Sequence, residues 1–412
     1  MTHAPNRSAR RPRRAEQIFA LASAVIALRV VDDELLQPAA GTSIADHPAA
    51  LLVPLALAGL AVVFFPRLRA GAQSLSALVF AALALVGGGI AFATLRVEGL
   101  HGSVWSGLVL LPAGVALLVL SIVILWRARR RRHLLGILLV PLTLFFVVMP
   151  VGVSLWTTHK YRDAIGTFAV AHQNVTLRTS DGLRLSGWYV PSRNRAAIVI
   201  VHGGGGDRMG ALRHASMLAA AGFGVLVYDA RGRGESQGAP EAYGWTWRRD
   251  IDAAVQFLQH RRDVDRTRIG ALGLSTGADV LVEYAAHHHE LRAVVADGST
   301  VRSMADARPV LHGGDLLTLP YWWVQFADER VLSGDSAGPT LARLAAQDTP
   351  TRMLFIASSW SVERTVAPLY ARAAHQPNDL WRVDADHTKG LARHPVAYTA
   401  RVTRFFGRTL LR

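Results

Sequence analysis

Hydrophobic residues are unevenly distributed along the 412-residue chain. Before about residue 157 they form long runs almost free of charge, and after about residue 174 they form short runs that alternate with amphipathic stretches. A helix needs about 20 mostly apolar residues to cross the hydrocarbon core of a bilayer. Five runs in the first part approach or reach that length, and we expect each to form a transmembrane helix: residues 17–36, 49–65, 75–95, 104–126 and 134–156.

The first of these runs has a second interpretation. Basic residues precede it, as in a cleavable signal peptide, Arg29 interrupts it, and Asp32, Asp33 and Glu34 lie near its end. However, no small-residue cleavage site precedes the acidic cluster, and further apolar runs follow. We therefore favour a retained helix, which gives five helices in an N-terminal membrane region.

The positions of the arginines predict an orientation in the lipid bilayer. Net charge is +15, and the strongest basic clusters lie beside the apolar runs. Cytoplasmic loops carry the excess of Lys and Arg. With five helices and the N-terminus inside, the N-terminal arginines, Arg67 with Arg69, and the cluster at 127–132 all lie on the cytoplasmic side. The chain after Trp156 is then extracytoplasmic. We therefore expect a multi-pass protein of the cell membrane.

Composition excludes several other classes of function. The chain has no cysteine, so it has no disulfide, no thiolate metal site and no cysteine nucleophile. The second half has no basic stripe with interleaved aromatics, so nucleic acid is not an expected partner. The apolar runs are almost without ionisable residues, which transport pathways usually contain, so we expect anchoring. His287, His288 and His289 point to different sides of a helix end, and we expect neither a metal nor another cofactor.

From about residue 174 the pattern is that of an α/β sheet. Short, nearly continuous apolar runs are typical of parallel strands buried on both faces. Predicted strands cover residues 174–178, 184–190, 196–201, 224–228, 268–274, 291–296, 352–357 and 380–383. Predicted helices separate most of them, at residues 209–221, 245–260, 278–288, 366–375 and 395–411. This alternation predicts a doubly wound, mostly parallel sheet, whose functional sites form at the carboxyl ends of strands.

A serine follows one of these strands in the pattern G-x-S-x-G, Gly273 to Gly277. Such a serine lies on a tight strand-to-helix turn that exposes its Oγ above the sheet. The five-residue pattern alone arises by chance, but here it follows an apolar strand and opens a helix. We expect Ser275 to be a catalytic nucleophile, with the backbone N–H of Thr276 donating to the oxyanion.

A glycine run and a histidine follow two other strands. His202 is followed by four glycines, which allow backbone N–H groups to approach an anion closely; the Gly-Lys-Ser/Thr of a phosphate-binding loop is missing. We expect Gly203 or Gly204 to supply the second oxyanion donor and His202 to be structural. His387, on the loop before the last helix, lies where a general base can reach the serine.

Together with the stretch Tyr228 to Ser236, these segments resemble the α/β-hydrolase superfamily over residues 174–412. The resemblance implies an α/β-hydrolase fold, a structural role for the stretch after the strand at 224–228, and the order serine, acid, histidine. It also implies an acid after the strand at 352–357, but the usual Gly-x-x-Asp is absent there. Glu363 is the only carboxylate in that loop and is the expected third member, which orients His387; its alternative is a surface glutamate paired with Arg364.

A long segment near residues 300–348 separates two strands, at a place where the family often inserts a lid. Tyr321, Trp322, Trp323 and Phe326 then line an acyl pocket, contact the bilayer interface or pack in the core of the lid. We expect residues 1–158 to be the membrane region, 159–173 a linker and 174–412 the hydrolase domain.

These features predict a membrane-anchored serine hydrolase that cleaves an ester-type, small-molecule or lipid-like acyl substrate. Peptide hydrolysis is the alternative with the same residues. The unusual acid loop leaves a further alternative open, a non-catalytic binding or sensor domain with the same fold.

Overall fold

The computed structural model describes residues 14–46, 48–100, 102, 104–127, 139–158, 164–347, 350–374 and 378–411. The chain forms two compact units. One consists of Met1–Gln37 and Pro48–Leu155, and the other of Pro38–His47 and Trp156–Arg412. Residues 38–47, which contain the short helix η2 (Ile44–Asp46), therefore belong with the C-terminal part of the chain.

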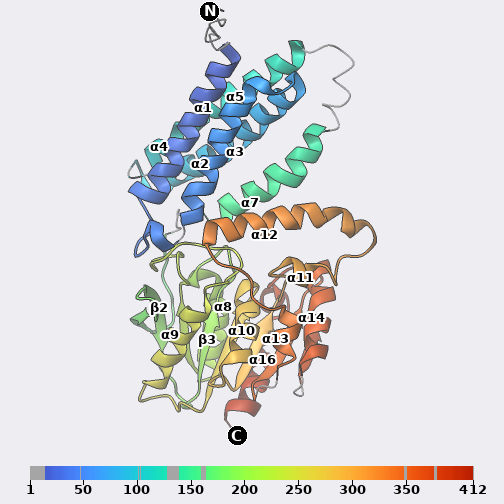
Figure 1. Cartoon of the computed structure of the whole chain (residues 1–412). Helices are drawn as coiled ribbons and strands as arrows, with labels where there is room; N and C mark the ends of the chain where they lie inside the picture. The colour runs from blue at the N-terminus through green and yellow to red at the C-terminus, as the bar shows by residue number, and fades with distance from the viewer. Residues whose placement is uncertain are drawn as a thin grey trace, which may run out of the picture. The chain divides into compact units, whose positions relative to one another are not determined.

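The first unit is helical in its described residues. Its elements are α1 (Arg14–Val31), η1 (Asp32–Leu36), α2 (Pro48–Phe64), η3 (Phe65–Arg67), α3 (Ala70–Glu98), α4 (Val104–Leu108), α5 (Leu110–Arg127), η5 (Leu144–Val148) and α7 (Met149–Thr157) (Figure 1). Helix α1 packs against α2 and α5, and α3 packs against α5. The centre of this packing includes Phe19, whose ring stacks on that of Phe65 with centroids 4.0 Å apart.

Within the described residues, four helical segments are long and apolar enough to cross a membrane: Pro48–Arg67, Ala70–Arg96, Val104–Arg127 and Leu139–Thr157. The expected number was five. The first predicted segment does form a helix, but α1 carries Arg14, Glu16 and Arg29 within its 18 residues, so it is less apolar than the other four. Residues 134–138 of the fifth predicted segment lie outside the described residues.

The second unit contains an eight-stranded sheet of the expected type. Its strands are β1 (Gln173–Arg178), β2 (Arg184–Val190), β3 (Ala197–Val201), β4 (Gly224–Tyr228), β5 (Ile269–Leu274), β6 (Ala293–Asp297), β7 (Arg352–Ala357) and β8 (Asp379–Arg382). Their order in the sheet is β1-β2-β4-β3-β5-β6-β7-β8. Strands β1 and β2 are antiparallel to their neighbours, and β3 to β8 are parallel to one another.

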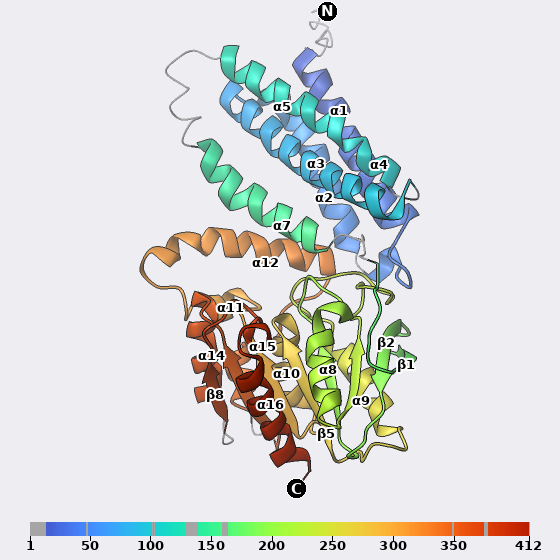
Figure 2. The same ribbon diagram turned by 180° about the vertical axis from the view of Figure 1, so that it is seen from behind.

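Helices bury both faces of the sheet. One face is covered by α8 (Leu212–Ala220) and α16 (Pro395–Leu410), and the other by α9 (Arg248–Gln259), α10 (Thr276–His287), α13 (Leu341–Ala345) and α14 (Ser361–Ala373). Figure 1 shows α9 and α10, and Figure 2 shows α8 and α16, in front of the strands. The central strands β3 to β6 are buried along their whole length, which explains their nearly unbroken apolar sequences.

The segment between β6 and β7 is mainly helical. It contains α11 (Met304–Ala307), η7 (Gly313–Thr318), the long helix α12 (Leu319–Ser333) and α13. Besides η2, the described part of this unit contains the short helices η6 (Arg208–Ala211) and α15 (Gly390–Arg393). Below, the segment from α11 to the end of α12 is called the lid.

Candidate active site

Ser275 lies on the turn between β5 and α10, at the carboxyl end of the sheet. Its backbone is in a region that L-residues rarely adopt, with φ 54° and ψ −121°. The neighbouring glycines are needed for space, since a Cβ on Gly277 would lie 2.3 Å from the carbonyl oxygen of Val201. The Ser275 N–H donates to the carbonyl of Asp297 on the adjacent strand (2.8 Å). The turn is thus over-determined by its surroundings, as a strained functional residue requires.

The side chains of His387 and Glu363 continue from Ser275 in one chain of hydrogen bonds. His387 Nε2 lies 2.9 Å from Ser275 Oγ, and His387 Nδ1 lies 2.6 Å from Glu363 Oε1. Glu363 is an acceptor when ionised, so Nδ1 carries the ring proton and leaves Nε2 free to accept the serine proton. This arrangement can make a serine hydroxyl nucleophilic.

Glu363 lies in the first turn of α14, although the sequence suggested a loop position. Its side chain is fully buried, whereas the imidazole of His387 is 36% exposed. Ser358 donates its N–H to Oε2 and its hydroxyl to Oε1, both at 2.7 Å. The partner of this carboxylate is therefore His387 and not the neighbouring Arg364, and its remaining lone pairs are satisfied by Ser358.

The expected oxyanion donors lie beside the serine. An added Cβ on Gly203 would be 3.4 Å from Ser275 Cβ, so this glycine lies close to the serine side chain. The side chain of Thr276 reaches across and donates its hydroxyl to the carbonyl of Ala242 (3.1 Å). A Cβ on Gly204 would lie 2.2 Å from the same oxygen. The glycine loop thus fits in the narrow space between the serine turn and the loop at Ala242.

His202 holds the glycine loop in place. Its Nδ1 lies 2.7 Å from the carbonyl of Gly203, and its Nε2 accepts the N–H of Ala230 (3.0 Å). Burial lowers the pKa of His202 to about 4. A neutral imidazole that donates from Nδ1 and accepts at Nε2 satisfies both bonds.

The stretch after β4 is held by contacts with other parts of the same unit. Arg231 is buried and bonds to Asp250 (2.7 Å) and to Asp181 (2.8 Å). Asp229 accepts the N–H groups of Arg208 and Glu235, both at 2.9 Å. These contacts tie the stretch to the turn between β1 and β2, to α9 and to η6, which is consistent with the expected structural role.

The four aromatic residues of the lid lie on different sides of α12. Phe326 is buried and packs against Tyr243 with ring centroids 4.9 Å apart, and Trp322 stacks on Phe326 at 5.8 Å. Tyr321 is half-buried and meets Trp322 edge to face at 5.7 Å. Trp323 points outward and is 63% exposed. Trp322 and Phe326 thus pack inward, and Trp323 is free to contact another surface.

Three further residues contact the site and were not predicted. The ring of Trp360 meets that of His387 edge to face, with centroids 5.0 Å apart. A Cβ on Gly298 would lie 3.2 Å from Cε1 of His387, so this glycine makes room for the imidazole. Asp297 is buried and accepts the hydroxyl of Tyr398 (2.6 Å). Asp297 and Gly298 directly follow the strand predicted at 291–296, at the edge of the sheet where sites form, and that position is the signal that could have found them.

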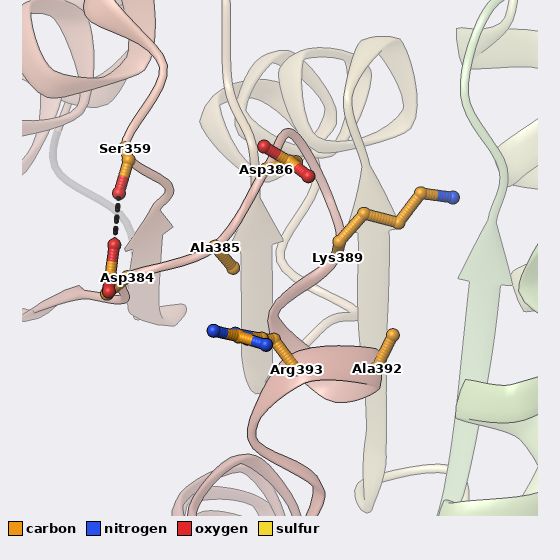
Figure 3. A pocket seen from close by; sticks show the side chains of 7 residues that line it. All are labelled: Ser359, Asp384, Ala385, Asp386, Lys389, Ala392 and Arg393. Atoms are coloured by element: carbon orange, nitrogen blue, oxygen red, sulfur yellow. Dashed lines mark hydrogen bonds between the residues drawn. The ribbon is translucent and has the colours of Figure 1, made fainter.

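A pocket of about 460 Å³ lies at the loop that carries His387. It is lined by Ser359, Asp384, Ala385, Asp386, Lys389, Ala392 and Arg393. Figure 3 shows Ser359 bonded to Asp384, and Lys389 extending away from Asp386. Neither Ser275 nor His387 lines this pocket, and the charged residues that line it are of both signs. We therefore assign the pocket no role in the chemistry.

A doubly wound sheet with its serine on a strained strand-to-helix turn is the architecture of α/β hydrolases. The family model described as serine aminopeptidase S33 matches residues 192–337. An uncharacterized protein of Mycobacterium tuberculosis, Rv2307c, is 30% identical over 210 residues, which cover 50% of this chain and 69% of that protein. YcjY of Escherichia coli, also uncharacterized, is 30% identical over 217 residues, covering 48% of this chain and 67% of that protein. The chain belongs to this family of α/β hydrolases.

Among solved structures, an esterase of Pyrococcus furiosus, Pf2001, is similar to part of this chain. It is 22% identical, the match covers 60% of this chain and 97% of that one, and the TM-score is 0.48.

Proposed function

We propose that the protein is a membrane-anchored serine hydrolase that cleaves ester-type acyl substrates. The observation that carries the proposal is the hydrogen-bond chain from Ser275 through His387 to Glu363, with distances of 2.9 and 2.6 Å. A hydrolase that used another nucleophile would have no need for a strained serine in line with a histidine and a buried carboxylate.

In the proposed reaction, Ser275 Oγ attacks the carbonyl carbon of the substrate while its proton passes to His387 Nε2. The imidazolium then gives this proton to the leaving alcohol, and an acyl-serine ester remains. A water molecule, deprotonated by the same nitrogen, attacks the ester and releases the carboxylic acid and free serine. Glu363 keeps the Nδ1 proton in place throughout and stabilises the imidazolium.

The backbone N–H of Thr276 and that of Gly203 or Gly204 are the proposed donors to the tetrahedral oxyanion. Both groups belong to rigid turns, and the helix that starts at Thr276 adds the positive end of its dipole. Donors fixed before the reaction need no reorganisation as the charge develops, and each is worth about 10²–10³ in kcat in enzymes where one has been removed.

Peptide hydrolysis by the same residues is a second candidate, which the serine aminopeptidase description of the matching family model favours. The two are separated by turnover of matched substrates. We expect purified full-length protein to hydrolyse a series of p-nitrophenyl esters of increasing acyl length, with no comparable turnover of amino-acid p-nitroanilides. Preferential cleavage of the anilides would replace the ester proposal with the peptidase one.

We further propose that the hydrolase domain, residues 174–412 with the insertion near 300–348 that contains the lid, lies outside the cytoplasm and is anchored by residues 1–158. The support comes from residues 38–47, which fold as part of the second unit. Ala39 is buried there, and the carbonyl of Ala40 accepts the N–H of Gly238 (2.7 Å). This loop and the hydrolase domain must therefore be on the same side of the membrane.

Four candidate spans separate this loop from the domain in the chain, and four crossings return to the starting side. Arg67 and Arg69 follow the first crossing, and the arginines at 127 and 129–132 follow the third, so both groups lie on the opposite side. Because cytoplasmic loops carry the Lys and Arg excess, that opposite side is the cytoplasm. A crossing of α1 then places the N-terminal arginines there as well.

This orientation is tested with reporters fused after Arg412 of the full chain. Alkaline phosphatase, which is active only outside the cytoplasm, should work at this position. The same reporter fused before Met1 is the control and should be inactive. A reporter that functions only in the cytoplasm and is active after Arg412 would contradict the orientation.

A further inference from the structure

The lid helix α12 contacts the loop after β4 through one face. Trp322, Phe326 and Glu329 are spaced by four and three residues and so lie on the same side of the helix. The ring of Phe326 packs on Tyr243 at 4.9 Å, and Glu329 Oε1 accepts the backbone N–H of Ala242 at 2.8 Å. A ring contact and a hydrogen bond therefore fix two successive residues of this loop to the lid.

Ala242 in turn touches both parts of the proposed oxyanion site. Its carbonyl oxygen accepts the hydroxyl of Thr276 (3.1 Å), and it lies so close to Gly204 that an added Cβ there would be 2.2 Å away. The N–H bound by Glu329 and this carbonyl belong to the two peptide groups that meet at Ala242. A displacement of the Ala242 backbone would therefore break the Thr276 hydrogen bond, change the space available to the glycine loop, or do both. The backbone of Ala242 thus contacts both residues that are expected to supply N–H donors.

We propose that Glu329 is a positioning residue for the oxyanion hole, which it sets by holding the backbone of Ala242 from the lid. The inference rests on the proposed serine hydrolase function and adds that the lid is coupled to the catalytic geometry. Residues on the lid thus contribute to stabilisation of the transition state without touching the substrate.

The environment of Glu329 is unusual for a carboxyl group. Its side chain is fully buried, and Oε2 meets no hydrogen-bond partner among the described residues. Burial, with the nearby Glu241 and Asp328, raises the pKa of Glu329 to about 8, while the Ala242 N–H and Arg233 act in the other direction. The group is therefore protonated and neutral at pH 7.

Ionisation of Glu329 would weaken the contact between lid and loop. A buried carboxylate without a second partner, next to Glu241, is stable only if it reaches water. The acid has a folded pKa above its ordinary value of 4.5, so the stability it contributes is fully present below about 4.5 and is lost as the pH rises from there to about 8. Besides these carboxyls, the charged or titratable groups facing it are Arg233 and Tyr243.

The test compares Glu329→Ala and Glu329→Gln in the full-length protein, with ester turnover as the assay. Asp315→Asn is the matched control, because it makes the same carboxyl-to-amide change at an exposed position of the lid. Wild-type turnover that depends on Ser275 is established first, so that failure of the proposed function is seen separately. Thermal melting shows whether each variant is folded.

We expect Glu329→Ala to lower kcat by about tenfold or more with KM changed by less than about threefold, the pattern for an interaction that acts in the transition state. Glu329→Gln keeps an acceptor for Ala242 and should retain kcat at pH 7. Above about pH 8 wild-type kcat should fall, whereas that of Glu329→Gln should not. Unchanged kcat in folded Glu329→Ala, or a loss confined to KM, would overturn the proposal. If Glu329→Ala does not fold, identical alkaline profiles of wild type and Glu329→Gln would overturn it.

Discussion

The substitution Glu363→Gln tests the assignment that the sequence supports least. In the wild type three donors converge on this buried carboxylate, the Ser358 N–H and hydroxyl and the His387 Nδ1–H. Glutamine has the same shape but replaces one oxygen by an NH₂ donor. Whichever way the amide turns, one donor will therefore face another donor.

Both orientations reduce catalysis. If the amide oxygen faces His387, the tautomer is correct, but the neutral amide no longer stabilises the imidazolium with a negative charge. The NH₂ then opposes the Ser358 N–H, and this unmade buried hydrogen bond costs about 1–3 kcal/mol of stability. If the NH₂ faces His387, the imidazole must accept at Nδ1 and carries its proton on Nε2, where it cannot take the proton from Ser275. The same tautomer error lowers kcat about 10⁴-fold in an aspartate-containing triad. We expect a loss of about 10²- to 10⁴-fold in kcat, or about 3–5 kcal/mol of barrier.

The assay is steady-state hydrolysis of a p-nitrophenyl ester by the purified full-length protein, with thermal melting to show that the variant is folded. Glu290→Gln serves as control, because Glu290 is an exposed residue between α10 and β6. A folded Glu363→Gln variant with wild-type kcat would show that another group orients His387.

Three further substitutions have defined expectations. Gly204→Ala, whose Cβ would lie 2.2 Å from a backbone oxygen of the neighbouring loop, should lower kcat by about 10² or more, while Gly205→Ala, with open space around it, should leave kcat unchanged. Gly298→Ala places a methyl group 3.2 Å from His387 at a backbone φ of +80°. It should lower kcat, and it should lower the free energy of unfolding by about 1–2 kcal/mol, seen as a lower melting temperature. Burial raises the pKa of Asp297 to about 7, so the free energy of unfolding should fall as the pH rises from about 4 to about 7. Asp297→Asn removes this titration, and its melting temperature should vary less over that range.

Much of the fold is predictable because buried parallel strands need unbroken apolar sequence. The strand expected at 196–201 runs from Ala197 to Val201, and that expected at 268–274 runs from Ile269 to Leu274. Ser275 is predictable for a related reason, since only a tight turn requires glycine on both sides of a serine at that point. These features depend on local sequence alone.

Other features depend on contacts between distant residues and have no local pattern. Glu329 is one of two acidic residues in α12, a helix of low amphipathicity. Its hydrogen bond to Ala242 joins residues 87 positions apart. The outward direction of Trp323 and the inward direction of Phe326 follow from how the lid docks on Tyr243. The first apolar run was predicted to be a membrane helix by its apolar residues, and its charges distinguish α1 from the four helices that are more apolar.

The most direct test of the account is covalent labelling with a fluorophosphonate, which reacts only with an activated serine. Wild-type protein should be labelled at Ser275, Ser275→Ala should not react, and Ser336→Ala, which changes an exposed serine of the same domain, should react as the wild type does. His387→Ala should react much more slowly, because the serine has lost its base. Wild-type protein that is not labelled, or equal labelling of Ser275→Ala, would contradict the serine hydrolase assignment.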